Sequence, residues 1–385
     1  MPDLILNEEE QMLQTTLRDF VDREIAPKAK ESDERGEFQW DAWRGFAELG
    51  LTGLGVDVKY GGSGPAGYRQ VSIAAEEVAR GDASASVSWL AHLALGVASI
   101  DRFGTEEQKE RILPPLVDGR GVAAFGLTEP GGGSDAAALQ TSAVERDGTW
   151  FLNGSKMFIT NASVAQNIVV FATQDRSQGY KGVSAFIVDK GSPGLAINPM
   201  HGKLGMRSST TDEIVFQDTP VPSENLLGEE GRGFNQAMEI LTSSRIIIAA
   251  QSTGIGQSAL ETALRYAQQR HSFGQPIAQH QAIQFMLADM AAEVHAARVV
   301  TMNAATLKDA GQPFLQEASI AKLMASEMCI RVADKALQIH GGSGYFQEAG
   351  VERILRDARV TTIYEGTSEV QRLLIARQLL KDYAI

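Results

Sequence analysis

A glycine-rich string, LTEPGGGSD, occupies Leu127–Asp135 and is the first candidate for ligand binding. Consecutive glycines expose backbone N–H groups and let a ligand approach the main chain, because no Cβ is present. Thr128 and Ser134 add hydroxyl groups to the same string. The glycines taken alone favour a flexible surface loop, so the binding hypothesis depends on the whole string.

Three charged residues could also take part in chemistry. Glu365 lies in the string IYEGTSE; taken alone, a glutamate is most often a solvated loop acid. Arg245 precedes three isoleucines, so it needs an anionic or polar partner if it is buried. Arg270, followed by Gly274, is typical of a helix C-terminus, where a cation meets the negative end of the dipole before a left-handed cap.

Motifs of several common enzyme classes are missing from the sequence. The six histidines form neither an HExxH motif nor a zinc-binding spacing with cysteine, so no metal site is expected. Gly254–Ala259 fits the GxGxxA pattern of dinucleotide-binding folds, which need a preceding strand and an acidic residue about 20 positions later. The apolar run before it continues an apparent helix, and positions 274 to 283 hold no Asp or Glu. Close helix packing explains these glycines better than nicotinamide binding does.

The composition is globular and acidic. Of the 385 residues, 43% are apolar and 22% charged, and the formal net charge is −13. Phosphate binding needs clustered Lys and Arg, so this charge argues against a nucleic-acid partner. The single cysteine, Cys329, has apolar neighbours and is expected in the core. Since no targeting signal and no run of 18 apolar residues is present, we expect a cytoplasmic protein without membrane insertion.

The elements that must position these residues change character twice. Residues 1–120 have helical periodicity, and residues 231–385 return to long helical segments. Residues 121–230 hold short runs of β-branched and aromatic residues, with turn pairs such as Asp147-Gly148 and Asn153-Gly154 between them. These patterns predict a mainly α protein with a central β domain. Its three parts would be an N-terminal helical domain, a small antiparallel β-barrel-like domain and a C-terminal four-helix bundle.

Five strings together resemble the acyl-CoA dehydrogenase family. They are LTEPGGGSD, LNGSKMFITNA, QRHSFG, QIHGGSGY and RDARVTTIYEGTSEVQRL. The resemblance covers essentially the whole chain, including the order of helical, β and helical regions, and is closest to the short-chain, butyryl-type members. It implies non-covalent FAD as the cofactor and an acyl-CoA thioester as the substrate.

The resemblance assigns many residues to a flavin site shared between subunits. Arg270 would bind the FAD pyrophosphate of a neighbouring subunit, which suits its forked donors. Such sharing implies an assembly of dimers, and we expect a homotetramer. The implied cofactor-binding residues are Phe125, Leu127, Thr128, Gly133, Ser134, Phe158, Ile159, Thr160, Arg270, Phe273, His280, Gln281, Gln338, Gly341, Gly342, Gly366, Thr367 and Glu369.

The same resemblance implies a smaller set of substrate contacts. Arg245 would be the main contact to the CoA moiety. Val87–Leu95 is similar to the helix that closes the acyl pocket in this family, where Trp89 and Leu90 could shorten the pocket. The implied substrate-binding residues are Ser134, Thr242, Arg245, Tyr364, Gly366 and Arg377.

Glu365 would be the catalytic base. Removing the weakly acidic α-proton of a thioester needs a positioned carboxylate and donors for the developing enolate oxygen, and enclosure should raise the pKa of that carboxylate. In the family the base comes from the acid before Gly-Thr or from the residue before the CoA-contacting Arg. The second position is Ser244 here, so both positions are expected to face the same α-carbon.

The expected function is FAD-dependent α,β-dehydrogenation of an acyl-CoA to the trans-2-enoyl-CoA, as in fatty acid β-oxidation. Electrons would pass to electron-transferring flavoprotein. An acyl-CoA oxidase that uses O₂ and a catalytically silent acyl-CoA-binding relative are the alternatives, and Glu365 argues against the second. The residues leave the acyl group open, with short to medium chains favoured.

Overall fold

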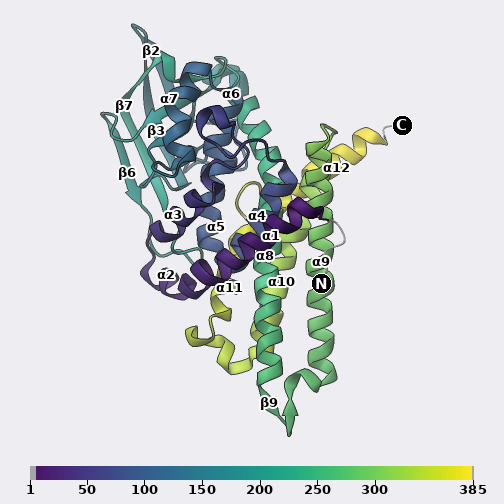
Figure 1. The fold of residues 1–385 in the computed structure, drawn as a ribbon. Helices are drawn as coiled ribbons and strands as arrows, with labels where there is room; N and C mark the ends of the chain where they lie inside the picture. Colours follow the sequence, from purple (N-terminus) through teal and green to yellow (C-terminus); the bar gives the residue numbers. More distant parts are fainter. Residues whose placement is uncertain (1–5, 384–385) are drawn as a thin grey trace.

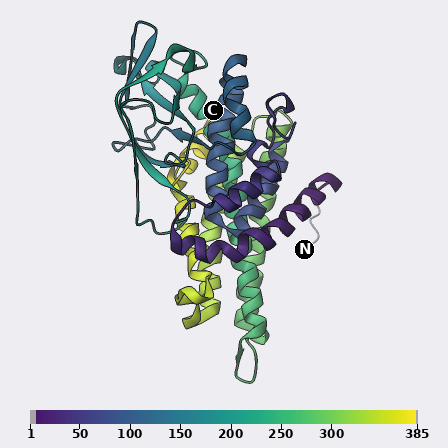
Figure 2. The ribbon, with the colours of Figure 1, turned by 60° about the vertical axis from the view of Figure 1, so that its left-hand side comes forward.

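The computed structural model describes residues 6–383 and contains the three expected regions. The β-domain lies against one end of the helices, and the long C-terminal helices extend away from it (Figure 1). The same arrangement is visible after rotation (Figure 2). The first few residues, which bear on the expected lack of a targeting signal, lie outside the described part of the chain.

The N-terminal region is helical. Its first helix begins at a capping box, in which Glu10 N donates to Asn7 Oδ1 at 2.9 Å and Asn7 N donates to Glu10 Oε2 at 3.0 Å. The α-helices of this region are α1 (Glu8–Phe20), α2 (Ala29–Arg35), α3 (Trp40–Glu48), α4 (Tyr68–Gly81), α5 (Ala83–Leu90), α6 (Ala98–Phe103) and α7 (Glu106–Val117).

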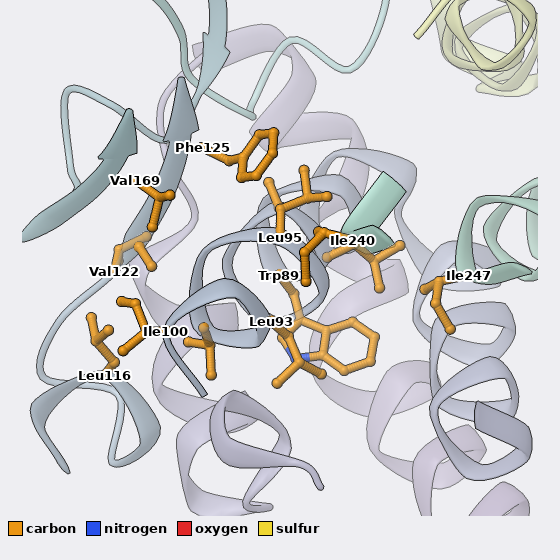
Figure 3. Packing of buried hydrophobic residues seen from close by; sticks show 14 of the residues in the cluster. Trp89, Leu93, Leu95, Ile100, Leu116, Val122, Phe125, Val169, Ile240 and Ile247 are labelled. Carbon is orange, nitrogen blue, oxygen red and sulfur yellow. The ribbon is translucent and has the colours of Figure 1, made fainter. Parts of the chain in front are cut away.

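One continuous helix, Ala83–Phe103, forms the centre of this region; a π-helical segment, η5 (Ala91–Val97), joins α5 to α6. Its length and mean hydropathy of 1.4 would allow a membrane span, but 83% of its apolar window is buried inside the protein. The Trp89 indole N–H donates to the carbonyl of Leu51 at 2.8 Å. The helix therefore serves as a core helix of the folded protein, and its side chains Trp89, Leu93 and Leu95 pack among other apolar residues (Figure 3).

The β-domain contains one sheet. Its strands are β1 (Ala123–Gly126), β2 (Ser142–Arg146), β3 (Thr149–Thr160), β4 (Asn167–Thr173), β5 (Val183–Asp189), β6 (Leu195–Pro199), β7 (Thr211–Pro222) and β8 (Leu226–Leu227). The order is β6-β7-β3-β2-β4-β5-β8, with β1 beside β4. Most pairs are antiparallel, but the sheet does not close into a barrel, and β1 runs parallel to β4. A parallel pair needs a long crossover, which the chain between β1 and β4 supplies.

One of the two predicted turns is confirmed and the other is wrong. Asp147 and Gly148 both have positive φ, 49° and 77°, and join β2 to β3 as a tight hairpin requires. Asn153-Gly154 instead lies inside β3, where the register with β7 shifts. Gly154 has φ 141°, and a Cβ there would stand 2.7 Å from Thr141 Cα. The glycine therefore marks a bulge and a close backbone approach.

The C-terminal region consists of α8 (Gly233–Gln269), α9 (Gln281–Asp309), α10 (Leu315–His340), α11 (Val351–Ala358) and α12 (Ser368–Asp382). The first three pack against one another, and α12 packs on α10. A Cβ at Gly254 would lie 2.1 Å from Glu76 O, and one at Gly256 would lie 2.8 Å from Met328 Sδ. Close helix packing therefore explains these glycines, as predicted. Cys329 is buried in the same core.

Candidate active site

Glu365 lies in the turn between a short 3-10 helix, Arg359–Thr362, and α12. It has φ 50°, and the following Gly366 has φ 94°. A non-glycine residue rarely adopts this left-handed conformation, so the surrounding structure must hold Glu365 in it. Thr367 then caps α12, because its hydroxyl accepts from Val370 N at 3.3 Å. The turn fixes the direction of the Glu365 side chain.

Ser244 lies on α8 and contacts the Glu365 side chain. Its hydroxyl group donates a hydrogen bond to the Glu365 carboxylate, and the Ser244 residue is only 1% exposed. The contact joins two residues that are 121 positions apart. The structure therefore places Glu365 and Ser244 in contact, while their common orientation toward a substrate stays a prediction.

The surroundings of Glu365 make its carboxylate more basic. Burial raises the pKa of Glu365, while the hydrogen bond from Ser244 and the positive charges of Lys322 and Arg245 act in the opposite direction. A raised pKa suits a group that must accept a proton from a weak carbon acid. The direction of the shift is the one expected from the sequence.

Arg245 is 6% exposed and lies one residue after Ser244. Its Nη1 donates to Thr242 Oγ1 at 3.3 Å, so the polar partner expected for a buried arginine is present. Burial lowers the pKa of Arg245, and the negative charge of Glu365 opposes that shift. Its Nε has no hydrogen-bond partner within the described residues. Arg245 thus retains a donor for a polar ligand.

Three buried polar residues near the turn, Lys322, Gln371 and Gln251, were not predicted. Lys322 Nζ donates to the carbonyl of Gly366 at 2.7 Å, and Gln371 Nε2 donates to the same oxygen at 3.0 Å. The Tyr364 hydroxyl donates to Gln251 Oε1. Lys322 could have been found from the sequence, because it is a lone lysine among helix positions that are otherwise apolar, such as Ala318, Ala321 and Ala325.

The glycine-rich string is held by a second group of residues that the sequence did not reveal. Lys156 Nζ lies 2.7 Å from Glu129 Oε1 and 3.3 Å from Leu127 O. The Glu129 carboxylate also accepts from Gln140 N at 2.6 Å and from Thr141 N at 2.9 Å. Lys156 is fully buried and Glu129 is 6% exposed. This ion pair anchors the start of the string to β3.

The string also lies beside the predicted flavin-contacting strand. Met157 N donates to Thr128 O at 2.9 Å, which places the residue before Phe158 next to the string.

 The hydrogen bond from Met157 to Thr128 thus links β3 directly to the glycine-rich string. A Cβ at Gly131 or Gly132 would meet nothing within 4 Å, so the backbone there is open to a ligand. Phe158 is 60% exposed and has φ 61°, which turns its ring outward, whereas Ile159 is buried.

The string and the turn around Glu365 border one apolar region. Phe125 and Leu127 belong to the same buried cluster as Ile240 of α8, and Tyr364 packs against that cluster. Phe125 lies close to Leu95 and Ile240 (Figure 3). This apolar cluster therefore joins the glycine-rich string, the core helix and Tyr364, the residue before Glu365.

A different group of predicted residues lies far from this region within one chain. Arg270 ends α8, whose 37 residues span about 55 Å from the β-domain to its far end. A hairpin follows, made of β9 (His271–Ser272) and β10 (Gln275–Pro276), and Phe273 at its tip is 94% exposed. These residues cannot reach the glycine-rich string of their own chain.

The predicted residues of α10 lie at this same far end. The rings of Tyr266 and His340 stack with their centroids 4.1 Å apart, which joins the ends of α8 and α10. His280 lies beside the hairpin, with its Nε2 3.2 Å from Ser272 O. The structure therefore groups Arg270, Phe273, His280, Gln281, Gln338, Gly341 and Gly342 apart from the string.

The other predicted residues have less definite surroundings. Glu369 and Arg377 are exposed on α12, and Thr160 and Ser134 are not buried. Trp89 and Leu90 are buried, and the Trp89 indole N–H donates a hydrogen bond to the Leu51 carbonyl, so both residues belong to the core of the N-terminal region. The effect of these two residues on an acyl pocket stays a prediction.

Comparison with known proteins follows the same three regions. The acyl-CoA dehydrogenase N-terminal domain matches residues 7–120, the middle domain matches residues 124–219, and the C-terminal domain matches residues 231–380. These matches agree with the expected order of helical, β and helical regions.

Similar proteins match over nearly the full length. A Bacillus subtilis protein named "Probable acyl-CoA dehydrogenase YngJ" is 48% identical, covering 98% of this chain and 99% of its own. The mitochondrial short-chain specific acyl-CoA dehydrogenase of Rattus norvegicus is 46% identical, covering 98% and 92%. The solved structure of butyryl-CoA dehydrogenase from Megasphaera elsdenii has a TM-score of 0.95 at 44% identity, covering 98% and 100%. The chain therefore belongs to the acyl-CoA dehydrogenase family.

Proposed function

We propose that the protein converts an acyl-CoA thioester to the trans-2-enoyl-CoA, with Glu365 as the catalytic base. The observation that carries this proposal is the Glu365 carboxylate, which lies in a left-handed turn and accepts a hydrogen bond from Ser244. The carboxylate would accept the α-proton of the thioester. The backbone N–H of Glu365 would donate to the thioester carbonyl, on which negative charge develops as the proton leaves.

The residues of the chain fit FAD as the cofactor. The backbone at Gly131 and Gly132 leaves room for a ligand, although the Gly132 N–H itself donates to Glu129 O at 3.1 Å, and the exposed Phe158 ring offers an aromatic face. When bound, FAD supplies the acceptor for the β-hydrogen and its electron pair. The residues that would hold it from this chain are Phe125, Leu127, Thr128, Gly133, Ser134, Phe158, Ile159, Thr160, Gly366, Thr367 and Glu369.

The substrate would be held mainly by α8 and by the turn. Arg245 has an unpaired buried Nε, so a polar group of the CoA moiety would satisfy it. Thr242, Ser134, Tyr364, Gly366 and Arg377 would complete the contacts. The similarity to short-chain relatives favours a short acyl chain, and the apolar region beside Phe125 would receive it.

The far-end residues would serve a neighbouring subunit. Because α8 carries Arg270 about 55 Å away from the β-domain, Arg270 and Phe273 are available to the FAD of another chain. This arrangement supports a homotetramer built as a dimer of dimers. Electron-transferring flavoprotein would accept the electrons, and the cytoplasm would be the compartment.

The proposal is tested with the purified protein under anaerobic conditions. Denaturation should release FAD, and mixing with a panel from butyryl-CoA to palmitoyl-CoA should bleach the flavin and yield the trans-2-enoyl product, most rapidly for the short chains. Rapid reoxidation by O₂ would favour the oxidase, and binding without bleaching would favour the silent relative. A colourless protein that fails to take up added FAD would overturn the proposal.

A further inference from the structure

Two buried side chains converge on the carbonyl oxygen of Gly366, the residue after the proposed base. Lys322, from α10, donates at 2.7 Å, and Gln371, from α12, donates at 3.0 Å. Both side chains are completely buried. A Cβ at Gly366 would lie 2.6 Å from Gln371 Nε2, so only glycine lets the amide come this close without a shift. Two helices therefore anchor this one carbonyl.

The turn needs such an anchor because its conformation is unfavourable. Glu365 has φ 50°, a value that side-chain-bearing residues keep only when their surroundings hold them there. The Gly366 carbonyl belongs to the peptide group between Gly366 and Thr367, so anchoring it fixes the chain one residue after Glu365 and limits how far the turn that carries the Glu365 side chain can rotate. If the Gly366 carbonyl were released, the turn could relax and the carboxylate would leave its position beside Ser244.

Lys322 also places a positive charge close to the base. The charged and titratable groups around Glu365 are Arg245 on α8, Lys322 on α10 and the neighbouring Tyr364. Those that act on Lys322 are Glu365, Arg245, Cys329 and Glu369. Burial lowers the pKa of Lys322 to about 8, although Glu365 opposes this shift, so the ammonium form still predominates at neutral pH.

Stability does not explain a lysine at this position. A fully buried ammonium group loses its hydration, and a carbonyl and a partly buried carboxylate compensate for that loss only in part. The folded state lowers the pKa of Lys322, so below about pH 8 the burial of its proton opposes folding. A methionine of similar length would avoid this penalty, and Gln371 would still bind the Gly366 carbonyl.

We propose that Lys322 is a positioning residue for the base: with Gln371 it anchors the Gly366 carbonyl, and its charge favours the ionised form of Glu365. This inference rests on the proposed function, because it assigns Glu365 as the base. Lys322 itself makes no contact with the reacting atoms in this scheme.

Three variants separate the anchor from the charge. Lys322→Met removes both, Gln371→Met removes one donor without changing the charge, and Lys335→Met is the matched control on the same helix. Lys335 is partly exposed and lies 2.9 Å from Glu293 on α9. For each variant, anaerobic flavin bleaching by butyryl-CoA is followed against pH, together with FAD content, substrate affinity and thermal stability.

Lys322→Met should bleach roughly 10- to 100-fold more slowly at unchanged substrate affinity, because a misplaced base loses this much. The midpoint of its acidic limb should rise by on the order of one pH unit, since an opposite charge beside the carboxylate is lost. Its thermal stability should not fall. Gln371→Met should slow bleaching without moving the midpoint, and Lys335→Met should change neither quantity.

An infrared titration of the Glu365 carboxyl group gives a readout that does not depend on turnover. The band is assigned by its absence in Glu365→Gln, and its midpoint should rise in Lys322→Met. If that variant does not fold, Lys322→Gln keeps a donor, removes the charge and carries the same prediction for the midpoint.

The proposal is overturned if Lys322→Met bleaches at the wild-type rate with an unchanged midpoint. It is also overturned if stability and activity fall together while the midpoint stays in place, because that pattern indicates a structural role alone. Failure of the proposed function is distinguishable, since Glu365→Gln would then bleach as the wild type does. If only the role of Lys322 is wrong, Glu365→Gln stays inactive.

Discussion

Moving the carboxylate from position 365 to position 244 tests the geometry of the site. Ser244 Oγ is hydrogen-bonded to the Glu365 carboxylate, so both positions border the same point in space. Glu365→Gly should leave the turn intact, because glycine adopts φ 50° without strain. That variant lacks the base and should lose about 10⁴-fold in rate, the upper end for general-base catalysis.

Adding Ser244→Glu to Glu365→Gly should restore part of this loss. The new carboxylate starts from a rigid helix and enters the space that the Glu365 side chain occupied. A displacement of about 1 Å can cost ~100-fold, so the double variant should work at roughly one hundredth of the wild-type rate. The 100-fold recovery over Glu365→Gly corresponds to about 2.7 kcal/mol of transition-state stabilisation.

The assay is anaerobic single-turnover flavin bleaching, with FAD content and substrate binding measured for each variant. Ser244→Glu alone is the control, because two adjacent carboxylates should raise the apparent pKa of the pair and slow bleaching at neutral pH. A double variant that binds FAD and substrate but stays as inactive as Glu365→Gly would refute the placement of Ser244 opposite the base.

Three further predictions concern the ion pair, the assembly and the pH dependence of stability. Lys156→Met should destabilise the protein by about 3–5 kcal/mol, because it leaves the buried Glu129 without its cation; adding Glu129→Gln should recover much of this in denaturant unfolding, and additive losses would contradict the pairing. Arg270→Ala should weaken FAD retention, which is measured by dialysis. Light scattering gives the oligomeric state, and a fully flavinylated, active wild-type monomer would exclude a shared site. The folded state raises the pKa of Glu365, so its ionised form opposes folding once the pH exceeds the unfolded pKa. Glu365→Gln should therefore raise the thermal midpoint more at about pH 8 than at about pH 5, and an equal shift at both values would count against the raised pKa.

The sequence was most informative where short strings carry the chemistry. Glu365 and Ser244 lie 121 positions apart and were paired through the family resemblance, and the structure shows that they are in contact. The close packing at Gly254 and the tight turn at Asp147-Gly148 followed from local rules on glycine. Each of these features depends on a few neighbouring residues or on a motif that is itself specific.

The features that the sequence did not reveal depend on tertiary contacts. Lys322 and Gly366 are 44 positions apart, and Glu129 and Lys156 are 27 positions apart, so no local pattern links them. Asn153-Gly154 has the composition of a turn, but the approach of Thr141 makes Gly154 a bulge inside a long strand. Closure of a sheet likewise depends on whether its edge strands meet, which strand patterns do not encode.

The most direct test of the central claim is the reaction of Glu365→Gln with butyryl-CoA in the absence of O₂. Substitution of the base by its amide keeps the shape of the side chain, so FAD content and substrate binding should match those of the wild type. Flavin bleaching should fall by several orders of magnitude. Bleaching of Glu365→Gln at a rate close to that of the wild type would contradict the assignment of Glu365 as the base.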